Sequence, residues 1–492
     1  MSSSDAASGP GTSAQDSSPY LDALAEFVTK GRERWDTPGH QGSVDAHPLM
    51  TSYFGERTLA LDFQTMVDGI DLGPDNAKQR SLTLAAQAWG SSRTWFLTNG
   101  STGGNLTACL AMAGMGGSLV AQRSVHSSVI SGLAMSGLAA TFIAPDLDEE
   151  LGISHGLTAQ ALDDALTANP DARIALVVTP SYFGACADVR ALADVAHRHN
   201  AALIVDEAWG AHFGFHPDLP TNAVRLGADL VVSSMHKLGG SLGQTALLHL
   251  GHGPFAEKLE PFVVRALDAM ASTSESTLLL ASLDIARREI AVHGATTINR
   301  SLATAARLRY RISSDGRYRD VTDKIRTYPS VVGIDPLRVV IDTRAGGVSG
   351  HEARHLLFEG GHHLELSTDS VVVALIGAGV ELDADGLADT LLGLPNRESE
   401  IRPVISLPPA GPRRMTVREA YFSAAEVISA ADAVGRISAD SVAAYPPGIP
   451  NLMPGEEITA ANLTFLQDTA AAPFGYVRGA ISPDMSLVRV VI

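Results

Sequence analysis

Three segments of this chain carry residues whose types and spacing could do chemistry together. The first is VVSSMHKLGGSLGQ (231–244), in which Lys237 follows a Ser-x-His pair and precedes small residues and glycines. The apolar run ADLVVSS predicts a buried strand that delivers Lys237 to a loop at the carboxyl end of a sheet. Because lysines normally lie on exposed polar surfaces, this setting indicates an amine with a chemical role.

The second segment is LIVDEAWGAHFGF (203–215), in which an apolar strand ends in Asp206. A carboxylate at the buried end of a strand is costly unless it meets a cation or a hydrogen-bond donor. Asp206 therefore predicts either a cationic partner or, as the alternative, a structural cap on the following turn.

The third segment is the loop LTNGSTGGN (97–105), which offers the hydroxyls of Ser101 and Thr102. Gly103 and the neighbouring glycines let the backbone approach a ligand, and the helix that follows directs free N–H groups to the same point. The loop favours an anion such as phosphate, with a simple tight turn as the alternative.

The elements around these segments predict how they are positioned. Helical segments (SLTLAAQAWG, GGNLTACLAMAG, ALADVAHRHN) alternate with apolar strands (TWFL, GSLVAQ, ARIALVVTP, AALIVDEA, DLVVSS), as in a parallel sheet with crossover helices that runs to about residue 250. The carboxyl ends of parallel strands meet at one edge, so the amine, the carboxylate and the anion loop converge there. Pyridoxal 5'-phosphate requires these three groups, for a Schiff base, for its pyridine nitrogen and for its phosphate.

The rest of the chain predicts a second, smaller domain. Residues 278–310 predict a long helix with a break near Gly294, which links two domains. Beyond it, PLRVVIDTR, HHLELSTDSVVVALIG and MSLVRVVI predict strands, and AAEVISAADAV predicts a helix, as in an α+β domain. The N-terminal MSSSDAASGPGTSAQDSS is typical of a disordered tail.

Composition excludes several classes of function. The 492 residues are 45% hydrophobic and 18% charged, which is enough for large cores. A net charge of −18 argues against nucleic acid and anionic membrane as partners, and no run of roughly 18 apolar residues predicts a membrane span. Two cysteines, Cys109 and Cys186, exclude a disulfide framework and favour a cytoplasmic location.

Several motifs together resemble those of a known family. The chain resembles the ornithine/lysine/arginine decarboxylases, which have the aspartate aminotransferase fold (pyridoxal-phosphate fold type I), in a short form without an N-terminal regulatory domain. The motifs that carry the resemblance cover most of the chain from residue 37 onward. They are TPGHQG (37–42), NGSTGGN (99–105), RSVHSSVISGL (123–133), TPSYFG (179–184), VDEAWGAHFGF (205–215), SSMHK (233–237), STSEST (272–277) and GRISADSVAAYPPGIPNLMPGEEIT (435–459).

The resemblance implies a role for each site residue. Lys237 would hold the cofactor as a Schiff base, Asp206 would pair with its ring nitrogen, and His126 would lie on the ring face. The expected phosphate ligands are Ser101, Thr102, Ser234 and His236.

Three further residues are expected around the cofactor. Trp209 and His212 would line its pocket, with ordinary packing as the alternative for both. Thr273 would reach the phosphate of a partner subunit. The chain departs from the family pattern at Ser127, where a lysine is usual, and at Glu275, where a proline is usual.

The resemblance also implies an organisation into parts. A disordered tail (1–19), an N-terminal segment with a dimer-interface loop (20–75), a cofactor-binding large domain (76–310) and a small C-terminal α+β domain (311–492) would form a homodimer or a higher oligomer. The expected reaction is decarboxylation of arginine, lysine or ornithine, with Lys237 or His236 returning a proton to Cα.

Other functions remain open at this point. An aminotransferase would need an arginine for the α-carboxylate, for which Arg418 is a candidate; a lyase, an oxidising enzyme and a cofactor-binding protein without turnover are further alternatives. HEARH (351–355) has the form of a zinc motif but is interpreted as a surface helix, so no metal is predicted. Glu365 matches a glutamate frequent in the family, and a solvated strand-edge carboxylate is the simpler interpretation.

Overall fold

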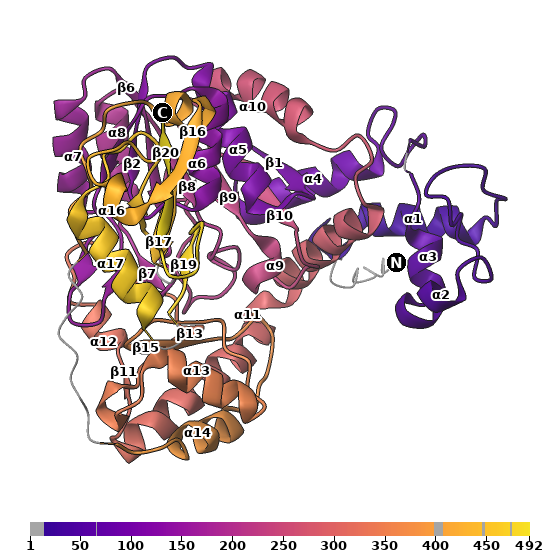
Figure 1. Ribbon diagram of the computed structural model, residues 1–492. Coiled ribbons are helices and arrows are strands. Elements are labelled where there is room, and N and C mark those ends of the chain that lie inside the picture. The colour runs from indigo at the N-terminus through magenta and orange to yellow at the C-terminus, as the bar shows by residue number, and fades with distance from the viewer. Residues whose placement is uncertain (1–13, 65, 398–406, 445–447, 473–474) are drawn as a thin grey trace, which may run out of the picture.

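The computed structural model describes residues 14–64, 66–397, 407–444, 448–472 and 475–492. Its largest part, the large domain, is built on a seven-stranded sheet covered by helices on both faces (Figure 1). The strands, in spatial order, are β1 (Arg93–Leu97), β10 (Ala246–Leu250), β9 (Leu230–Ser233), β8 (Ala202–Asp206), β6 (Ala172–Val178), β2 (Ser118–Gln122) and β3 (Ala140–Ile143). Six strands run the same way and β10 opposes them, so the expected α/β fold with a mostly parallel sheet is confirmed.

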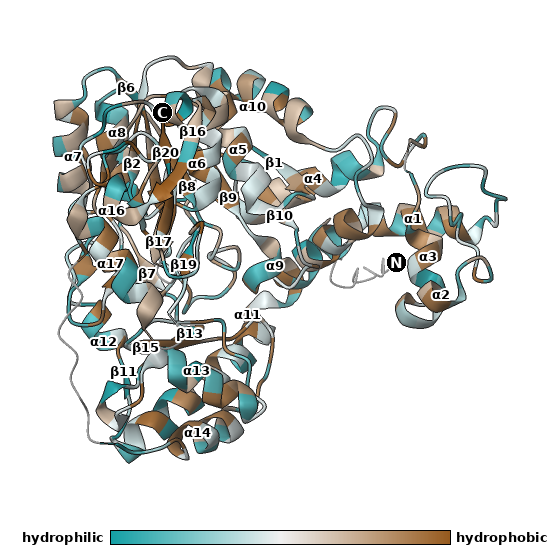
Figure 2. Ribbon diagram, viewed as in Figure 1, coloured by the Kyte–Doolittle hydropathy of each residue, from teal (hydrophilic) through white to brown (hydrophobic). Residues whose placement is uncertain are grey.

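Side-chain alternation along the strands assigns one layer of helices to each face. Ile204 and Val232 pack against α5 (Gly100–Ala113), α6 (Ser127–Ser136) and α10 (Ala256–Met270). Leu203 and Val205 pack against α7 (Ala159–Ala168) and α8 (Val189–Arg198) on the opposite face. The apolar strands therefore lie between two layers of helices, and these helices show both hydrophobic and hydrophilic bands along their length (Figure 2).

The same alternation positions the chemically interesting residues. Asp206 is two residues beyond Ile204, so it points to the α5 side of the sheet. β9 lies beside β8 in parallel, with Asp206 opposite Val232, and is followed by the short helix α9 (Met235–Leu238). Lys237 and Asp206 are thereby brought to the same edge of the sheet.

The N-terminal region packs on one end of the large domain and then extends away from it. A 3-10 turn (Ala14–Asp16) and α1 (Pro19–Thr29) lie against α4 (Ala77–Trp89). Residues 30–76, the N-terminal arm, contain α2 (Pro48–Phe54) and α3 (Glu56–Leu61) and project outward (Figure 1). Order therefore begins before Tyr20, the expected start; residues 1–13 of the expected tail lie outside the described residues.

A single helix of 39 residues, α11 (Thr277–Asp315), connects the large domain to the next part of the chain. The predicted break near Gly294 is absent, and the expected domain boundary at residue 310 falls inside this helix. A Cβ at Gly294 would lie 3.3 Å from Cβ of Phe215, so the glycine lets that loop pack closely against the helix. Neither α11 nor another helix in the described ranges is long and apolar enough to cross a membrane.

The small domain follows α11 and consists of an antiparallel sheet and three helices. Its strands, in spatial order, are β11 (Arg319–Asp320), β13 (Arg338–Asp342), β15 (Val371–Leu375) and β14 (Leu366–Ser367), and its helices are α12 (Thr322–Ile325), α13 (Gly350–Glu359) and α14 (Ala384–Leu392). Strand β12 (Gly333–Ile334) pairs instead with β7 (Ala185–Cys186) of the large domain.

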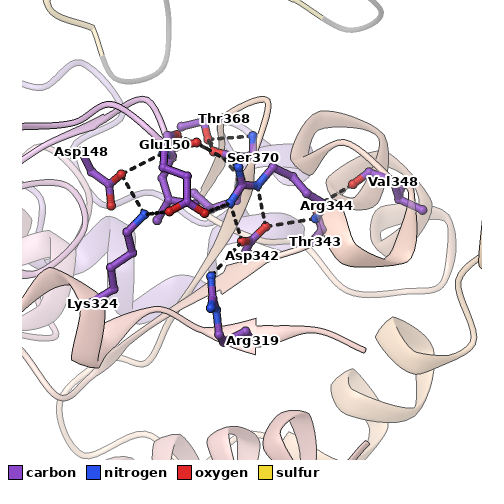
Figure 3. A network of polar contacts seen from close by, with 12 residues as sticks. Asp148, Glu150, Arg319, Lys324, Asp342, Thr343, Arg344, Val348, Thr368 and Ser370 are labelled. Atoms are coloured by element: carbon purple, nitrogen blue, oxygen red, sulfur yellow. Dashed lines mark hydrogen bonds and ion pairs between the residues drawn. The ribbon is translucent and has the colours of Figure 1, made fainter. Parts of the chain in front are cut away.

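An ion-pair network joins the small domain to the large domain (Figure 3). Glu150 lies in the hairpin between β4 (Leu147–Asp148) and β5 (Ile153–Ser154) of the large domain. It accepts hydrogen bonds from Lys324 Nζ at 2.6 Å and Arg344 Nη2 at 3.0 Å, and these two cations lower its pKa to about 2. Lys324 Nζ also donates to Asp148 Oδ1 at 3.0 Å, so Lys324 of the small domain binds two acidic residues of the large domain.

The remaining residues form a third part, the C-terminal unit (407–492), which packs on the large domain. It contains the strand pair β16 (Ala425–Ser429) and β20 (Leu487–Val491), and the sheet β18 (Pro450–Leu452), β17 (Val442–Ala444) and β19 (Val477–Arg478). Its helices are α15 (Val417–Phe422), α16 (Ala430–Ala433) and α17 (Ala460–Ala471). The single domain expected for 311–492 is thus divided in two, and half of the predicted helix AAEVISAADAV is strand β16.

Candidate active site

A cleft of about 290 Å³ opens at the carboxyl edge of the sheet and contains most of the predicted site residues. The loop before α5, the ends of β8 and β9, and the start of α6 contribute its walls. The predicted residues that line it are Ser101, Thr102, His126, Asp206, Trp209, Ser234, His236 and Lys237.

Lys237 lies deep in the cleft against an aromatic ring. Its Nζ is 3.7 Å from the ring centroid of Trp209, whose side chain is also contacted by the guanidinium of Arg338 at 4.8 Å. Burial lowers the pKa of Lys237 to about 8, with a further decrease from Arg338 and opposing increases from Asp206 and Glu365. A larger share of the amine is therefore neutral and nucleophilic near neutral pH than in an exposed lysine.

Asp206 is held by donors that keep it available as an anion. It is 3% exposed, Oδ1 accepts the backbone N–H of Ala208 at 3.1 Å, and Oδ2 accepts from Asn105 Nδ2 at 2.9 Å. Asn105 Nδ2 also donates to Ser128 Oγ at 3.0 Å. Two donors on one carboxylate stabilise its charged form, as binding of a cationic ring nitrogen requires.

The same hydrogen-bond chain orients His126. Its Nδ1 accepts the backbone N–H of Ser128 at 3.2 Å and lies 2.8 Å from Ser128 Oγ, which leaves the proton of the neutral ring on Nε2. Burial lowers the pKa of His126, as do the charges of Lys237 and Arg478, while Asp206 raises it. His126 is therefore a neutral, oriented ring beside Lys237.

The opposite end of the cleft can hold an anion. Ser101 Oγ and Ser234 Oγ are 2.6 Å apart, although one comes from α5 and the other from the link between β9 and α9. Gly100 begins α5 at a φ of +72°, which favours glycine and lets the chain turn sharply into the helix. The N-terminal N–H groups of α5 and the two hydroxyls thus face one region.

His236 is fixed from the neighbouring strand. Its Nδ1 lies 2.7 Å from the carbonyl oxygen of Thr245, and because a carbonyl only accepts, this nitrogen carries the proton. His236 also lines the cleft, so this contact holds its ring in place there.

Three predicted cofactor residues lie outside the lining of the cleft. Gly103 supports it indirectly, because a Cβ there would lie 2.1 Å from Cγ of the lining residue Asn99. His212 Nε2 is 3.1 Å from Asp335 Oδ1, and both side chains are fully buried. Thr273 is exposed on a loop before α11, so this chain alone does not bring it to the cleft.

Two other candidates from the sequence, Arg418 and the HEARH segment, lie outside the lining of the cleft and make packing contacts. Arg418 Nη1 donates to the carbonyls of Ala134 and Met135 at the end of α6 opposite to His126. His351 of the HEARH segment lies on α13 and contacts Ser367 Oγ at 3.0 Å. Among the described residues, no group of three or more His, Cys, Asp and Glu is arranged to hold a metal ion.

Taken together, the lining residues fit pyridoxal 5'-phosphate. Lys237 offers an amine, Asp206 a carboxylate for the pyridine nitrogen, and the Ser101 region a set of donors for the phosphate. Asn105 Oδ1 is buried without a hydrogen-bond partner among the described residues, so the site holds an unused acceptor in the same region. Asn105 is one of the lining residues that sequence reasoning missed, although it lies one helical turn after Ser101 and hence on the same helix face.

Comparisons with known proteins agree with this geometry. Residues 18–380 match the family described as "Orn/Lys/Arg decarboxylase, major domain", and residues 406–472 match "Orn/Lys/Arg decarboxylase, C-terminal domain". Arginine decarboxylase from Bacillus subtilis (strain 168) is 33% identical over 97% of this chain and 98% of its own length. Arginine decarboxylase from Halalkalibacterium halodurans is 33% identical over 94% of this chain and 95% of its own length.

Solved structures share the fold at lower identity. The constitutive lysine decarboxylase of E. coli superposes with a TM-score of 0.80 at 20% identity, over 97% of this chain and 82% of that one. Lysine decarboxylase A from Pseudomonas aeruginosa gives 0.82 at 20% identity, over 96% of this chain and 80% of that one. The chain therefore belongs to the Orn/Lys/Arg decarboxylase family and is a decarboxylase.

Proposed function

We propose that this decarboxylase acts on a basic α-amino acid, with arginine as the first candidate, and uses pyridoxal 5'-phosphate held by Lys237. One observation supports this proposal. The buried amine of Lys237 and the carboxylate of Asp206, which accepts two hydrogen bonds, lie in the same cleft, and the far end of this cleft can hold a phosphate. When bound, the cofactor supplies an electron sink for the electrons left at Cα as carbon dioxide departs.

The residues of the chain would then act as follows. Lys237 binds the cofactor covalently, and Asp206, itself held by Asn105, keeps a proton on the ring nitrogen. His126 packs on the ring as a neutral group. The phosphate is held by Ser101, Thr102, Ser234 and His236. Either Lys237 or His236, the latter in its protonated form, would return a proton to Cα.

Recognition of a basic side chain has support from charge. Glu365 of the small domain is exposed, and its negative charge raises the pKa of Lys237, so it is close enough to act on the amine. A carboxylate in this position attracts a substrate with a cationic end. Arginine is placed before lysine and ornithine because relatives 33% identical over nearly the whole chain are named arginine decarboxylases.

We further propose that the enzyme is a homodimer with shared active sites. The N-terminal arm exposes large apolar side chains, including Trp35 (84%), Tyr53 (79%) and Leu49 (73%). Surfaces of this kind in water are normally covered by another protein surface, and a second copy of the chain is the proposed cover. Thr273, exposed on the loop before α11, is then available to the phosphate of the partner subunit.

The test is product analysis with purified protein and added pyridoxal 5'-phosphate. We expect carbon dioxide and the corresponding amine from arginine, and less from lysine and ornithine, with no product from the Lys237→Ala variant. A keto acid in place of the amine would indicate an aminotransferase, and oxygen consumption would indicate an oxidising enzyme. Cofactor binding without any product would contradict the proposed function.

A further inference from the structure

A buried arginine of the small domain lies against the wall of the active site. Arg338, the first residue of β13, is 1% exposed, and its guanidinium carbon is 4.8 Å from the ring centroid of Trp209. The Nζ of Lys237 lies 3.7 Å from the same centroid. One indole is thus contacted both by the amine of Lys237 and by a cation from another domain.

The guanidinium of Arg338 is bonded to the backbone of two segments that line the cleft. Nη2 donates to the carbonyl oxygen of Trp209 at 2.9 Å, and Nη1 donates to the carbonyl oxygen of Ser181. Ser181 precedes Tyr182, whose ring packs edge-on against Trp209 with the centroids 5.7 Å apart. Tyr182 and Trp209 both line the cleft, so one side chain fixes the backbone that carries both rings.

Arg338 is itself held by a buried carboxylate. Asp335 Oδ2 lies 3.4 Å from Arg338 Nε, and Asp335 Oδ1 lies 3.1 Å from Nε2 of His212. All three of these side chains are fully buried. His212 follows Trp209 by three residues in the same loop, so the contacts form a closed ring that joins this loop to the start of β13.

The chemistry of this ring of contacts suits positioning better than stability. Taking an arginine and an aspartate out of water has a desolvation cost that offsets most of their attraction, and apolar residues of similar volume can often replace such a pair without loss of stability. A guanidinium, however, presents five N–H donors in one plane and can bond a carboxylate and two carbonyls together. Arg338 therefore has the geometry to hold the Trp209 loop and the Tyr182 segment in one fixed arrangement.

We propose that Arg338 is a positioning residue for Lys237: by holding the indole of Trp209 in place, it keeps the amine of Lys237 seated against that ring in the cleft. The small domain then takes part in the active site through a side chain that does not itself line the cleft. The inference rests on the proposed function for the task of the amine, but the position of the amine can be measured without cofactor.

Several ionisable groups surround the two cations. Those that act on Lys237 are Asp206, Arg338 and Glu365, and those that act on Arg338 are Asp335, Cys186, Glu365 and Tyr182. Burial has a larger effect on the pKa of Lys237 than any of these groups. A change that lets water reach the amine should therefore raise the pKa of Lys237 even when every charge around it is kept.

The experiment measures the seating of the amine through its protonation. Cofactor-free, full-length protein is labelled with acetic anhydride between pH 6 and 11, and modification of Lys237 is followed by peptide mass spectrometry. The midpoint of the labelling rate should lie near pH 8, because burial lowers the pKa of Lys237 to about 8. Arg338→Lys keeps the positive charge beside Asp335 but loses the planar donors, so the indole should shift and the midpoint should rise by about one pH unit.

Two further variants show whether the effect passes through Trp209. Arg309 gives the matched control, because it also bonds a carboxylate, that of Asp320, and two carbonyls in the small domain, but lies outside the lining of the cleft. Arg309→Lys should leave the midpoint within about 0.2 pH unit. In a Trp209→Leu background the midpoint should already be raised, and Arg338→Lys should add less than about 0.3 pH unit, because substitutions that act through one contact are not additive.

Two results would overturn the inference. An unchanged midpoint in Arg338→Lys would mean that Arg338 only fastens the small domain to the large domain. A rise of full size in the Trp209→Leu background would mean that the effect does not pass through the indole. Release of carbon dioxide tests the proposed function separately: if no basic amino acid yields it, the proposed function fails, while the labelling still decides the role of Arg338.

Discussion

The pKa of Lys237 makes the most direct prediction from this structure. Burial lowers it from 10.5 to about 8. At pH 7.5 about a quarter of the amine is then neutral, against about 0.1% for an ordinary lysine, a difference of about 200-fold in nucleophile. The rate at which cofactor-free protein takes up pyridoxal 5'-phosphate should therefore reach half of its maximum near pH 8.

Replacing Glu365 with glutamine tests how a neighbouring charge affects the pKa of Lys237. Glu365 raises the pKa of Lys237, so its removal should lower that pKa further and move the half-maximal rate to lower pH. The assay is stopped-flow absorbance of cofactor uptake between pH 6 and 10, with Lys237→Ala as the control that forms no covalent link. A half-maximal rate above pH 10 in the unaltered protein, or an upward shift in Glu365→Gln, would refute the reasoning.

Three further predictions concern residues around the cleft. Asn105→Ala removes one of the donors of Asp206, so cofactor affinity and kcat should fall about tenfold or more, as steady-state kinetics would show. Arg338→Met leaves Asp335 buried without its cation and should destabilise the protein by about 3–5 kcal/mol; the added change Asp335→Asn should recover much of the lost thermal stability, and no recovery would argue against this pairing. Gly103→Ala should displace Asn99 and weaken cofactor binding in a fluorescence titration, whereas Gly243→Ala, where a Cβ meets nothing within 4 Å, should bind normally.

Local patterns in the sequence predicted five of the seven strands of the large sheet, but not β3 or the antiparallel β10. The apolar runs that predict strands correspond to β1, β2, β6, β8 and β9, because a strand covered on both faces needs a continuous run of apolar residues. The prediction of a helix over residues 424–434 is wrong for its first half, because residues 425–429 pair with the edge of β20 as a strand. Only its second half is helical, and Ser429 caps that helix. Gly294 stays helical because the packing of Phe215 against the helix offsets the low helix propensity of glycine.

In the site, too, residues near the ends of strands were predicted from the sequence, whereas contacts between residues far apart in the chain were not. Asp206 is the last residue of one strand and Lys237 lies shortly after another, so the ends of the two apolar runs predict that these side chains meet. Arg478 contacts Ser127 across 351 positions of the chain, and no local pattern indicates such a contact. That neighbour depends on how the C-terminal unit docks, which only tertiary structure reveals.

Helix α11 has a mechanical consequence for the enzyme. Its 39 residues form a rod of about 58 Å, which starts directly after the loop that holds Thr273 and ends in the small domain. Near its far end, Arg311 is ion-paired to Asp385 of α14, so this end of the rod is attached to the small domain. A displacement of the Thr273 loop would therefore be passed along one uninterrupted helix to the small domain.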